Sequence, residues 1–327
     1  ELRTDFLEGI KEVTGNSAIN TLADRFLNKA LQDIHQERWW WAERRTTIVT
    51  KPPYSTGTVT VTKGSTAVTG SSTAWTTTDS FGNANAADAD KIVLGSIADV
   101  YLISGTPAAT SLTLGSRFTG DDVSAGGYTV FQDEYALASD FDDVIDARTF
   151  SDDLKIDLID AQEFYRRFAR NSIRGTPQVA TIITLDPSSS ASLRRRVIFG
   201  LAPDRAYTIP YRYYTTQLAV SSTGTRQAFL SAAADEPIIP IRFRAALVYK
   251  AKHLWYTTRK QDPESAAGAA AEYTTIMLRA RAAKGPADDR VRLEPRTGAY
   301  WRHARRPYRR GTSPRLTTGQ AWDQLRE

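Results

Sequence analysis

The chain has 327 residues, of which 41% are hydrophobic and 24% charged, a composition typical of a globular protein with two or three domains. The absence of cysteine excludes a disulfide framework, a thiolate zinc site and a cysteine nucleophile. Nine arginines and one acid, Glu294, lie between Arg290 and Arg315, so this segment has a net charge of +8. Because the whole chain has a net charge of +5, the remaining residues together carry about −3. No apolar run approaches the roughly 18 residues that cross a bilayer, so we expect no membrane insertion.

The amino-terminal segment predicts two helices joined by a short link. The first spans residues 2–14 and is followed by Gly15, a residue type that commonly follows a helix end. The second spans residues 18–43 and carries an apolar stripe at three- and four-residue steps. The stripe consists of Ile19, Leu22, Ala23, Phe26, Leu27, Ala30, Leu31 and Ile34.

Three consecutive tryptophans, Trp39, Trp40 and Trp41, lie near the end of this second helix. Successive helical residues lie about 100° apart, so the three indoles cannot all share the buried face. Trp41 continues the stripe, whereas we expect Trp39 and Trp40 to face the following β region or an adjacent subunit. The alternative is that the indoles cap the core where helix meets sheet.

The pattern changes to β at Lys51-Pro52-Pro53. From Gly57 to Gly70 the residues alternate around a turn at Lys63-Gly64-Ser65, which predicts a β-hairpin. We expect a small β domain over residues 46–133 and a β region with one helix, residues 152–171, over residues 134–235. Further strands are predicted at residues 91–94, 99–104, 110–114, 127–132, 178–185, 197–201 and 207–214.

Residues 236–284 predict a second helical hairpin, with helices over residues 237–259 and 264–283. Asp262, Pro263 and Glu264 supply an N-cap, a proline at the first helical position and an acid in the first turn. Since neither hairpin can bury its stripe alone, we expect this pair and the pair over residues 1–45 to form a four-helix bundle. The predicted fold is α+β, with a large, mostly β insertion and an extended basic arm over residues 285–327.

No motif indicates catalysis or a metal. The three histidines, His35, His253 and His303, lack metal-ligand spacing, and Lys63-Gly64-Ser65 lacks the spacing of a phosphate loop. The acids from Asp140 to Asp146 lack the glycine and glutamate of a calcium loop, so we interpret them as a solvated loop or a helix cap. We therefore predict no enzyme activity, no cofactor and no metal site.

The basic arm is the strongest physicochemical signal in the sequence. Arginines with interleaved aromatics suit phosphate contact and base stacking, and they suit an acidic protein groove equally well. A solvated tail is the third interpretation. The arm residues predicted to bind a partner are Tyr300, Trp301, Arg302, Arg305, Arg306, Tyr308, Arg309, Arg310 and Trp322.

The order of these segments resembles that of head-to-tail adaptor proteins of tailed bacteriophages. The resemblance covers about the first 285 residues, although the region from Tyr54 to Leu230 is larger than minimal members need. It depends on Phe26-Leu27-Asn28-Lys29-Ala30, on Glu37-Arg38-Trp39-Trp40-Trp41, on the hairpin GTVTVTKGSTAVTGSSTAW from Gly57 to Trp75, and on Asp235-Glu236-Pro237-Ile238-Ile239-Pro240 before an alanine-rich hairpin.

The resemblance implies a structural virion protein of the neck, assembled in the host cytoplasm. Such adaptors form a homo-oligomeric, dodecameric ring beneath the portal protein, extend the DNA channel and present a platform to tail or nozzle proteins. Their carboxyl-terminal segment commonly reaches back to the portal. Two alternatives stay open: a nucleic-acid-binding virion module whose arm contacts packaged DNA, and a tail-tube or head-completion protein.

Overall fold

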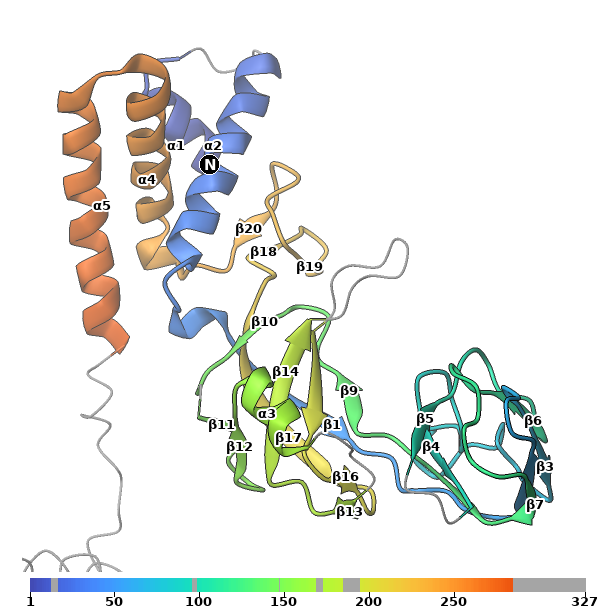
Figure 1. The fold of residues 1–327 in the computed structure, drawn as a ribbon. Helices are drawn as coiled ribbons and strands as arrows, with labels where there is room; N and C mark the ends of the chain where they lie inside the picture. Colours follow the sequence, from blue (N-terminus) through green and yellow to red (C-terminus); the bar gives the residue numbers. More distant parts are fainter. Residues whose placement is uncertain (13–16, 96–98, 147, 169–172, 185–194, 285–327) are drawn as a thin grey trace, which may run out of the picture. The chain divides into compact units, whose positions relative to one another are not determined.

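A computed structural model describes residues 1–12, 17–95, 99–146, 148–168, 173–184 and 195–284 of the chain (Figure 1). Helices and strands occupy similar shares of the described residues, and the strands form several mostly antiparallel sheets. The chain divides into a unit over residues 1–274 and a unit over residues 275–327. Of the second unit, the structure describes the helical residues 275–284.

The helical region consists of α1 (Leu2–Gly9), α2 (Ser17–His35), α4 (Ala245–Trp255) and α5 (Pro263–Lys284). The first three pack on one another (Figure 1), and the rings of Phe6 and Phe26 meet the indole of Trp255 at centroid distances of 6.2 and 5.3 Å. A 3-10 turn, Ile241–Phe243, precedes α4, and a π-helical turn, Tyr256–Lys260, follows it.

The predicted four-helix bundle is wrong. Extensive contacts join α1, α2 and α4, but within the described residues none of similar extent joins α5, up to Thr274, to α1 or α2. Instead α5 contacts α4, where His253 Nδ1 donates to the Ala266 carbonyl at 3.1 Å and Lys250 lies over the Tyr273 ring. The physical reason is that the apolar residues of α5 are spread around the helix and do not gather on one face.

Helix caps decide where the predicted helices begin. The Asp262 carboxylate accepts from the backbone N–H groups of Glu264 and Ser265, both at 3.2 Å, so the predicted N-cap of α5 is confirmed. The predicted helix over residues 152–171 is wrong in its first half, because residues 152–155 form a turn and are followed by β12 (Ile156–Leu158), which pairs with β11 (Thr149–Ser151). The helix, α3 (Ala161–Arg167), begins only after Asp160, whose carboxylate accepts from the backbone of Gln162 at 2.9 Å.

Two sheets share one aromatic core in the middle of the chain. The first has the order β1-β17-β10, formed by Glu43–Val49, Thr208–Thr215 and Phe141–Val144. The second has the order β11-β12-β14-β15-β9, in which β14 is Val179–Thr184, β15 is Arg195–Phe199 and β9 is Glu134–Ala136. β12 and β14 are parallel and are connected through α3, which packs on β14. The strands predicted at residues 178–185, 197–201 and 207–214 are thus confirmed.

Residues 54–131, named here the small β segment, have a core of their own. Its strands form two sheets, β6-β3-β2-β7 and β5-β4-β8, and the bridge Ile103–Leu114 joins the residues that follow β5 and β6, while Tyr54 forms a bridge to Val130 of β8. The predicted hairpin and the four strands predicted after it are confirmed. The strands are β2 (Thr58–Val61), β3 (Ala67–Ser71), β4 (Lys91–Leu94), β5 (Val100–Leu102), β6 (Ser111–Thr113), β7 (Val123–Gly126) and β8 (Tyr128–Phe131).

Trp75, the last residue of the hairpin motif from Gly57 to Trp75, lies in the core of the small β segment. Its buried indole donates to the Tyr128 hydroxyl at 3.0 Å, and that hydroxyl donates to the Thr56 carbonyl at 2.6 Å. Burial raises the pKa of Tyr128 to about 12, so the hydroxyl stays protonated at neutral pH. A side chain at Gly70 would approach the Trp75 ring to 2.8 Å, which accounts for the glycine.

Short strands complete the described residues. β13 (Arg174–Gly175) pairs in parallel with β16 (Ala202–Pro203). β18 (Ala219–Val220) lies between β19 (Arg226–Gln227) and β20 (Glu236–Pro237), so the helical segment predicted to begin at Pro237 begins later, at the 3-10 turn.

Two ion pairs join Asp90 and Lys91, in the middle of the small β segment, to residues that flank this segment on either side. Lys51 Nζ lies 2.6 Å from Asp90 Oδ2, and these side chains are only 4% and 2% exposed. Lys91 Nζ lies 2.7 Å from Asp133 Oδ2. The Tyr135 hydroxyl accepts from the Lys51 backbone N–H at 3.0 Å. Burial raises the pKa of Asp90 above its usual value, although the neighbouring Lys51 acts to lower it.

Asp90→Asn should destabilise the chain strongly, because Lys51 then keeps a buried charge without its counter-charge. We expect the free energy of unfolding at neutral pH to fall by about 3–5 kcal/mol, measured by chemical denaturation. The double variant Lys51→Met/Asp90→Leu should lose much less, since no charge is left unpaired. Lys63→Met, which removes the exposed pair Lys63–Asp121, is the control and should leave stability nearly unchanged. Equal losses in the single and double variants would contradict this account.

Candidate functional site

The three tryptophans lie where α2 gives way to β1. α2 ends at His35, and Trp39 has extended backbone angles, so the predicted continuation of the helix to residue 43 is wrong. Trp40–Ala42 form a short 3-10 turn before β1 begins at Glu43. The physical reason is the seven-residue pairing of β1 with β17, a tertiary interaction that overrides the local helical pattern.

Trp39 and Trp41 stack face to face and close the helical core. Their ring centroids are 4.6 Å apart, their planes differ by 4°, and the residues are 3% and 7% exposed. Trp39 Nε1 donates to the Ile34 carbonyl at 2.8 Å, which satisfies one of the free carbonyl groups at the end of α2. The stack therefore serves both as a helix cap and as part of the core.

Trp41 connects this stack to His35 and to the turn before α4. Its Nε1 donates to His35 Nε2 at 3.0 Å, and His35 Nδ1 donates to the Leu31 carbonyl at 2.8 Å. Both bonds require a neutral imidazole with its proton on Nδ1. The Trp41 ring also lies 6.2 Å from the Phe243 ring. Burial lowers the pKa of His35, in agreement with the neutral form.

Trp40 is the half-buried member of the three. Its ring meets Trp41 edge-on at 5.4 Å, and its Nε1 has no hydrogen-bond partner among the described residues. Trp40 thus retains accessible surface that Trp39 does not have. Contact of Trp39 or Trp40 with an adjacent subunit stays a prediction, and the burial of Trp39 makes Trp40 the better candidate.

A loop beside α2 is held in a defined shape by two residues of the resemblance segments. Asn28 forms two 2.9 Å hydrogen bonds with the backbone of Leu230, one to its N–H and one to its carbonyl. The Asp235 carboxylate accepts from the N–H groups of Ser231 and Ala232, both at 2.7 Å. Immediately before Leu230 the loop presents Phe229, which is 47% exposed. A preorganised loop with an exposed aromatic suits recognition of a partner.

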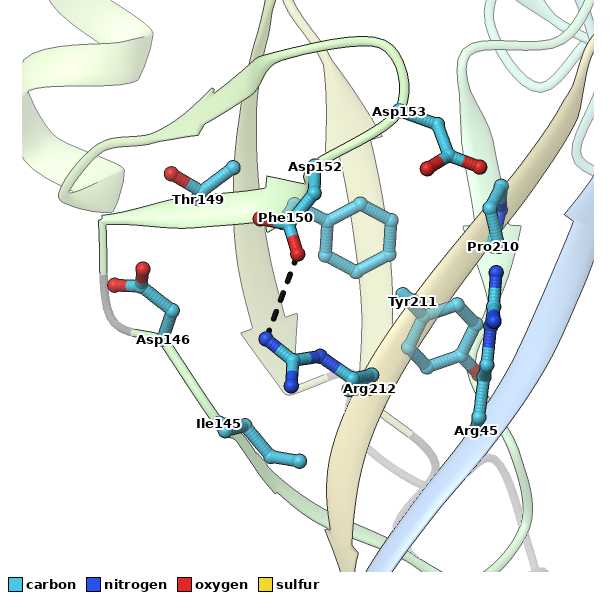
Figure 2. A pocket seen from close by; sticks show the side chains of 10 residues that line it. All are labelled: Arg45, Ile145, Asp146, Thr149, Phe150, Asp152, Asp153, Pro210, Tyr211 and Arg212. Atoms are coloured by element: carbon cyan, nitrogen blue, oxygen red, sulfur yellow. Dashed lines mark hydrogen bonds and ion pairs between the residues drawn. The ribbon is translucent and has the colours of Figure 1, made fainter. Parts of the chain in front are cut away.

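A charged pocket lies on the outer face of the sheet β1-β17-β10 (Figure 2). Its volume is about 290 Å³, and it is lined by Arg45, Ile145, Asp146, Thr149, Phe150, Asp152, Asp153, Pro210, Tyr211 and Arg212. Arg45 stands directly opposite Arg212 in the strand register, a repulsive arrangement. Figure 2 shows the Arg212 guanidinium and the Asp152 carboxylate turned toward each other, with a separation of 3.4 Å.

Chemically, this pocket is suited to charge pairing. Arg45 and Asp153 have no ion-pair partner within the described residues, so each is available to a second molecule. Phe150 and Tyr211, whose rings stack 5.0 Å apart, also line the pocket. In the described part of the chain, no group of three or more acids or histidines is arranged to hold a metal ion.

The sequence predicted neither the contacts of Asp140 and Asp143 nor the pocket. Asp140 was expected in a solvated loop or a helix cap, but its carboxylate accepts from the hydroxyls of Tyr213 at 2.8 Å and Thr215 at 2.6 Å. Asp143 forms an ion pair with Arg38. Arg45 and Arg212 meet only through pairing of distant strands, so no local pattern could have joined them.

The predicted binding residues of the arm lie outside the described residues. They are Tyr300, Trp301, Arg302, Arg305, Arg306, Tyr308, Arg309, Arg310 and Trp322. His303 lies there too. Their roles therefore stay predictions from the sequence.

Comparison with known proteins provides no relative. No family model matches the chain, and no curated protein matches it significantly. Among the described residues, no helix has the length and apolar character needed to cross a bilayer. Function is therefore inferred from the residues and their geometry.

Truncation of Trp39 and Trp40, one at a time, should distinguish an indole that stabilises the core from one that contacts another subunit. Trp39→Ala removes a buried ring and a helix cap, so we expect the free energy of unfolding to fall by about 3–5 kcal/mol. Trp40→Ala should cost less than half of that but should weaken self-association of the folded chain, since its indole retains exposed surface. Denaturation and sedimentation measure the two effects. Similar stability losses with unchanged association would assign Trp40 to the core alone.

The buried His35 should make stability depend on pH. Its folded pKa lies below the unfolded value of about 6.5, so the unfolded chain binds the proton more readily. This contribution to the free energy of unfolding is complete above about pH 6.5 and is lost as pH falls toward the folded pKa. His35→Gln should flatten that part of a denaturation profile measured between about pH 5 and pH 8. An equally steep profile in the variant would contradict the assignment.

Proposed function

We propose that this chain is a structural virion protein that forms a ring beneath the phage portal, connects head to tail and extends the DNA channel. It would assemble in the host cytoplasm and reside in the neck of the virion. Its partners in this proposal are the portal protein, tail or nozzle proteins and copies of itself. No catalytic step is part of the proposal.

One observation carries the proposal: segments on which the family resemblance depends meet in the folded chain. Asn28 of the first segment binds the backbone of Leu230, and Asp235, which begins the last segment, shapes the same loop. Trp41 of the second segment packs on Phe243, three residues beyond Pro240. Residues about 200 positions apart in sequence thus form one local structure, which supports a common structural role for them.

The arm supplies the proposed attachment to the portal. Its arginines can pair bidentately with carboxylates on a protein surface, and its aromatics can bury apolar area on binding. These gains would offset the entropy lost when the segment becomes ordered. The remainder of the chain carries about −3, and a mildly acidic body would let DNA slide past rather than adhere.

The arm's charge of +8 also favours a second function, a nucleic-acid-binding virion module. In that case the arm would contact phosphates of packaged DNA, and affinity for DNA would fall steeply with salt. A tail-tube or head-completion role is a third candidate, and the position of the protein along the particle axis distinguishes it. An image of the virion would decide between the neck and the tail.

Deletion of residues 286–327 should leave a folded chain that no longer attaches to DNA-filled heads. We expect an unchanged melting temperature and at least a tenfold loss of cosedimentation with heads, because the arm makes the attachment. Normal attachment of the truncated chain would contradict the proposed arm.

A matched variant separates the portal from DNA as the arm's partner. Replacement of the nine arginines between Arg290 and Arg315 by lysine keeps the charge but removes the planar guanidinium pairs. If the arm binds portal carboxylates, this variant should attach poorly to heads. If the arm binds DNA phosphates by charge alone, attachment should persist, together with a gel shift of free DNA that salt abolishes.

A further inference from the structure

β1 is an edge strand whose free side is unprotected over its second half. Among the described residues its only strand neighbour is β17, and the ladder continues to Thr50, whose N–H donates to the Tyr207 carbonyl at 2.9 Å. Alternation along an antiparallel pair then turns the backbone groups of Arg45, Thr47 and Val49 away from β17. The strand contains no proline and no bulge, and its charged residues, Glu43, Arg44 and Arg45, are confined to its first three positions, so the four residues Thr46–Val49 have none of the usual protections of an edge.

The opposite edge of the same sheet is protected. β10 is interrupted by a register shift between Phe141 and Asp143. The backbone N–H of Val144 donates to the carboxylate of Asp143 at 2.8 Å, so it is not free to pair with another strand. This contrast indicates that the exposure of β1 does not reflect a general lack of edge protection in this sheet.

Unpaired charges of both signs lie beside the open edge. The exposed Arg45 is on β1 itself, and the exposed Asp153 lines the same pocket (Figure 2). Neither has an ion-pair partner in the part of the chain that the structure describes. A surface with an unpaired guanidinium and an unpaired carboxylate is complementary in charge to another copy of itself.

We propose that the open edge of β1 and the adjoining charged pocket form a two-fold contact between two copies of this chain, in which Arg45 of each copy pairs with Asp153 of the other. The contact covers the free backbone groups of β1 and supplies the counter-charge that Arg45 lacks beside Arg212. Because one surface meets its own copy, this contact is two-fold, and it goes beyond the ring contacts of the proposed function, which join two different faces of neighbouring copies.

Charge exchange tests the pair. The full-length variants Arg45→Glu and Asp153→Arg should each raise the dissociation constant of the oligomer at least about tenfold, measured by analytical ultracentrifugation. The double variant Arg45→Glu/Asp153→Arg should recover most of the association. Unchanged association in the single variants, or no recovery in the double variant, would overturn the pairing.

Proline substitution tests the edge. Thr47→Pro removes a backbone N–H that faces away from β17, so the chain should keep its near-ultraviolet circular dichroism and lose its association. Thr46→Pro removes a donor that faces β17 and should instead destabilise the fold, which provides the matched control. If folded Thr47→Pro associates like the original chain, β1 is not the contact.

The tests of the β1 contact can fail while the proposed function holds, and the proposed function can fail while the β1 contact holds. All of these variants keep the arm, and attachment to heads is measured independently by the deletion of residues 286–327. A full-length chain that is monomeric at all concentrations would overturn the β1 contact, whereas attachment to heads would still support the adaptor. Association through β1 without attachment would support the contact and count against the adaptor.

Discussion

The two buried ion pairs, Lys51 with Asp90 and Lys91 with Asp133, are the constraint on which the arrangement of the strands depends. β1 ends just before Lys51, β4 contains Lys91, and β9 begins just after Asp133, so three strands are tied to one charged cluster. A buried charge costs several kcal/mol unless its partner stays in place. β1, β4 and β9 cannot shift relative to one another without separating these ion pairs. The pairs therefore help to fix the register of the strands in both central sheets.

The tryptophan junction applies a similar constraint to the helices. The stack of Trp39 on Trp41 ends α2, and the turn that follows sets the first residue of β1. Because Trp41 also contacts Phe243, the same ring helps to position the start of α4. The loop held by Asn28 and Asp235 lies between these elements in the chain. The proposed adaptor role and the proposed β1 contact therefore both depend on the tryptophan junction between α2 and β1.

Local signals were enough for some elements and not for others. The glycine-bounded hairpin, the strand at residues 91–94 and the Asp262 cap were predictable, because each depends on neighbouring residues. The end of α2 was not, because the helical stripe gave no sign that β17 would pair with residues 43–49. The bundle failed because the alanines of α5 indicate close approach without specifying a face. The pocket escaped notice because Arg45 and Arg212 belong to strands brought together only by the fold.

The pairing of β1 with β17 also bears on the order of folding. The hydrogen bond that joins Thr50 to Tyr207 spans 157 positions, whereas β2 and β3 are joined by a short turn. Closing so long a loop is slow, and a hairpin forms within microseconds. During synthesis β1 emerges long before its partner and has both edges open. The small β segment can fold before β17 is synthesised, so the ribosome-bound chain passes through a stage in which both edges of β1 are unpaired.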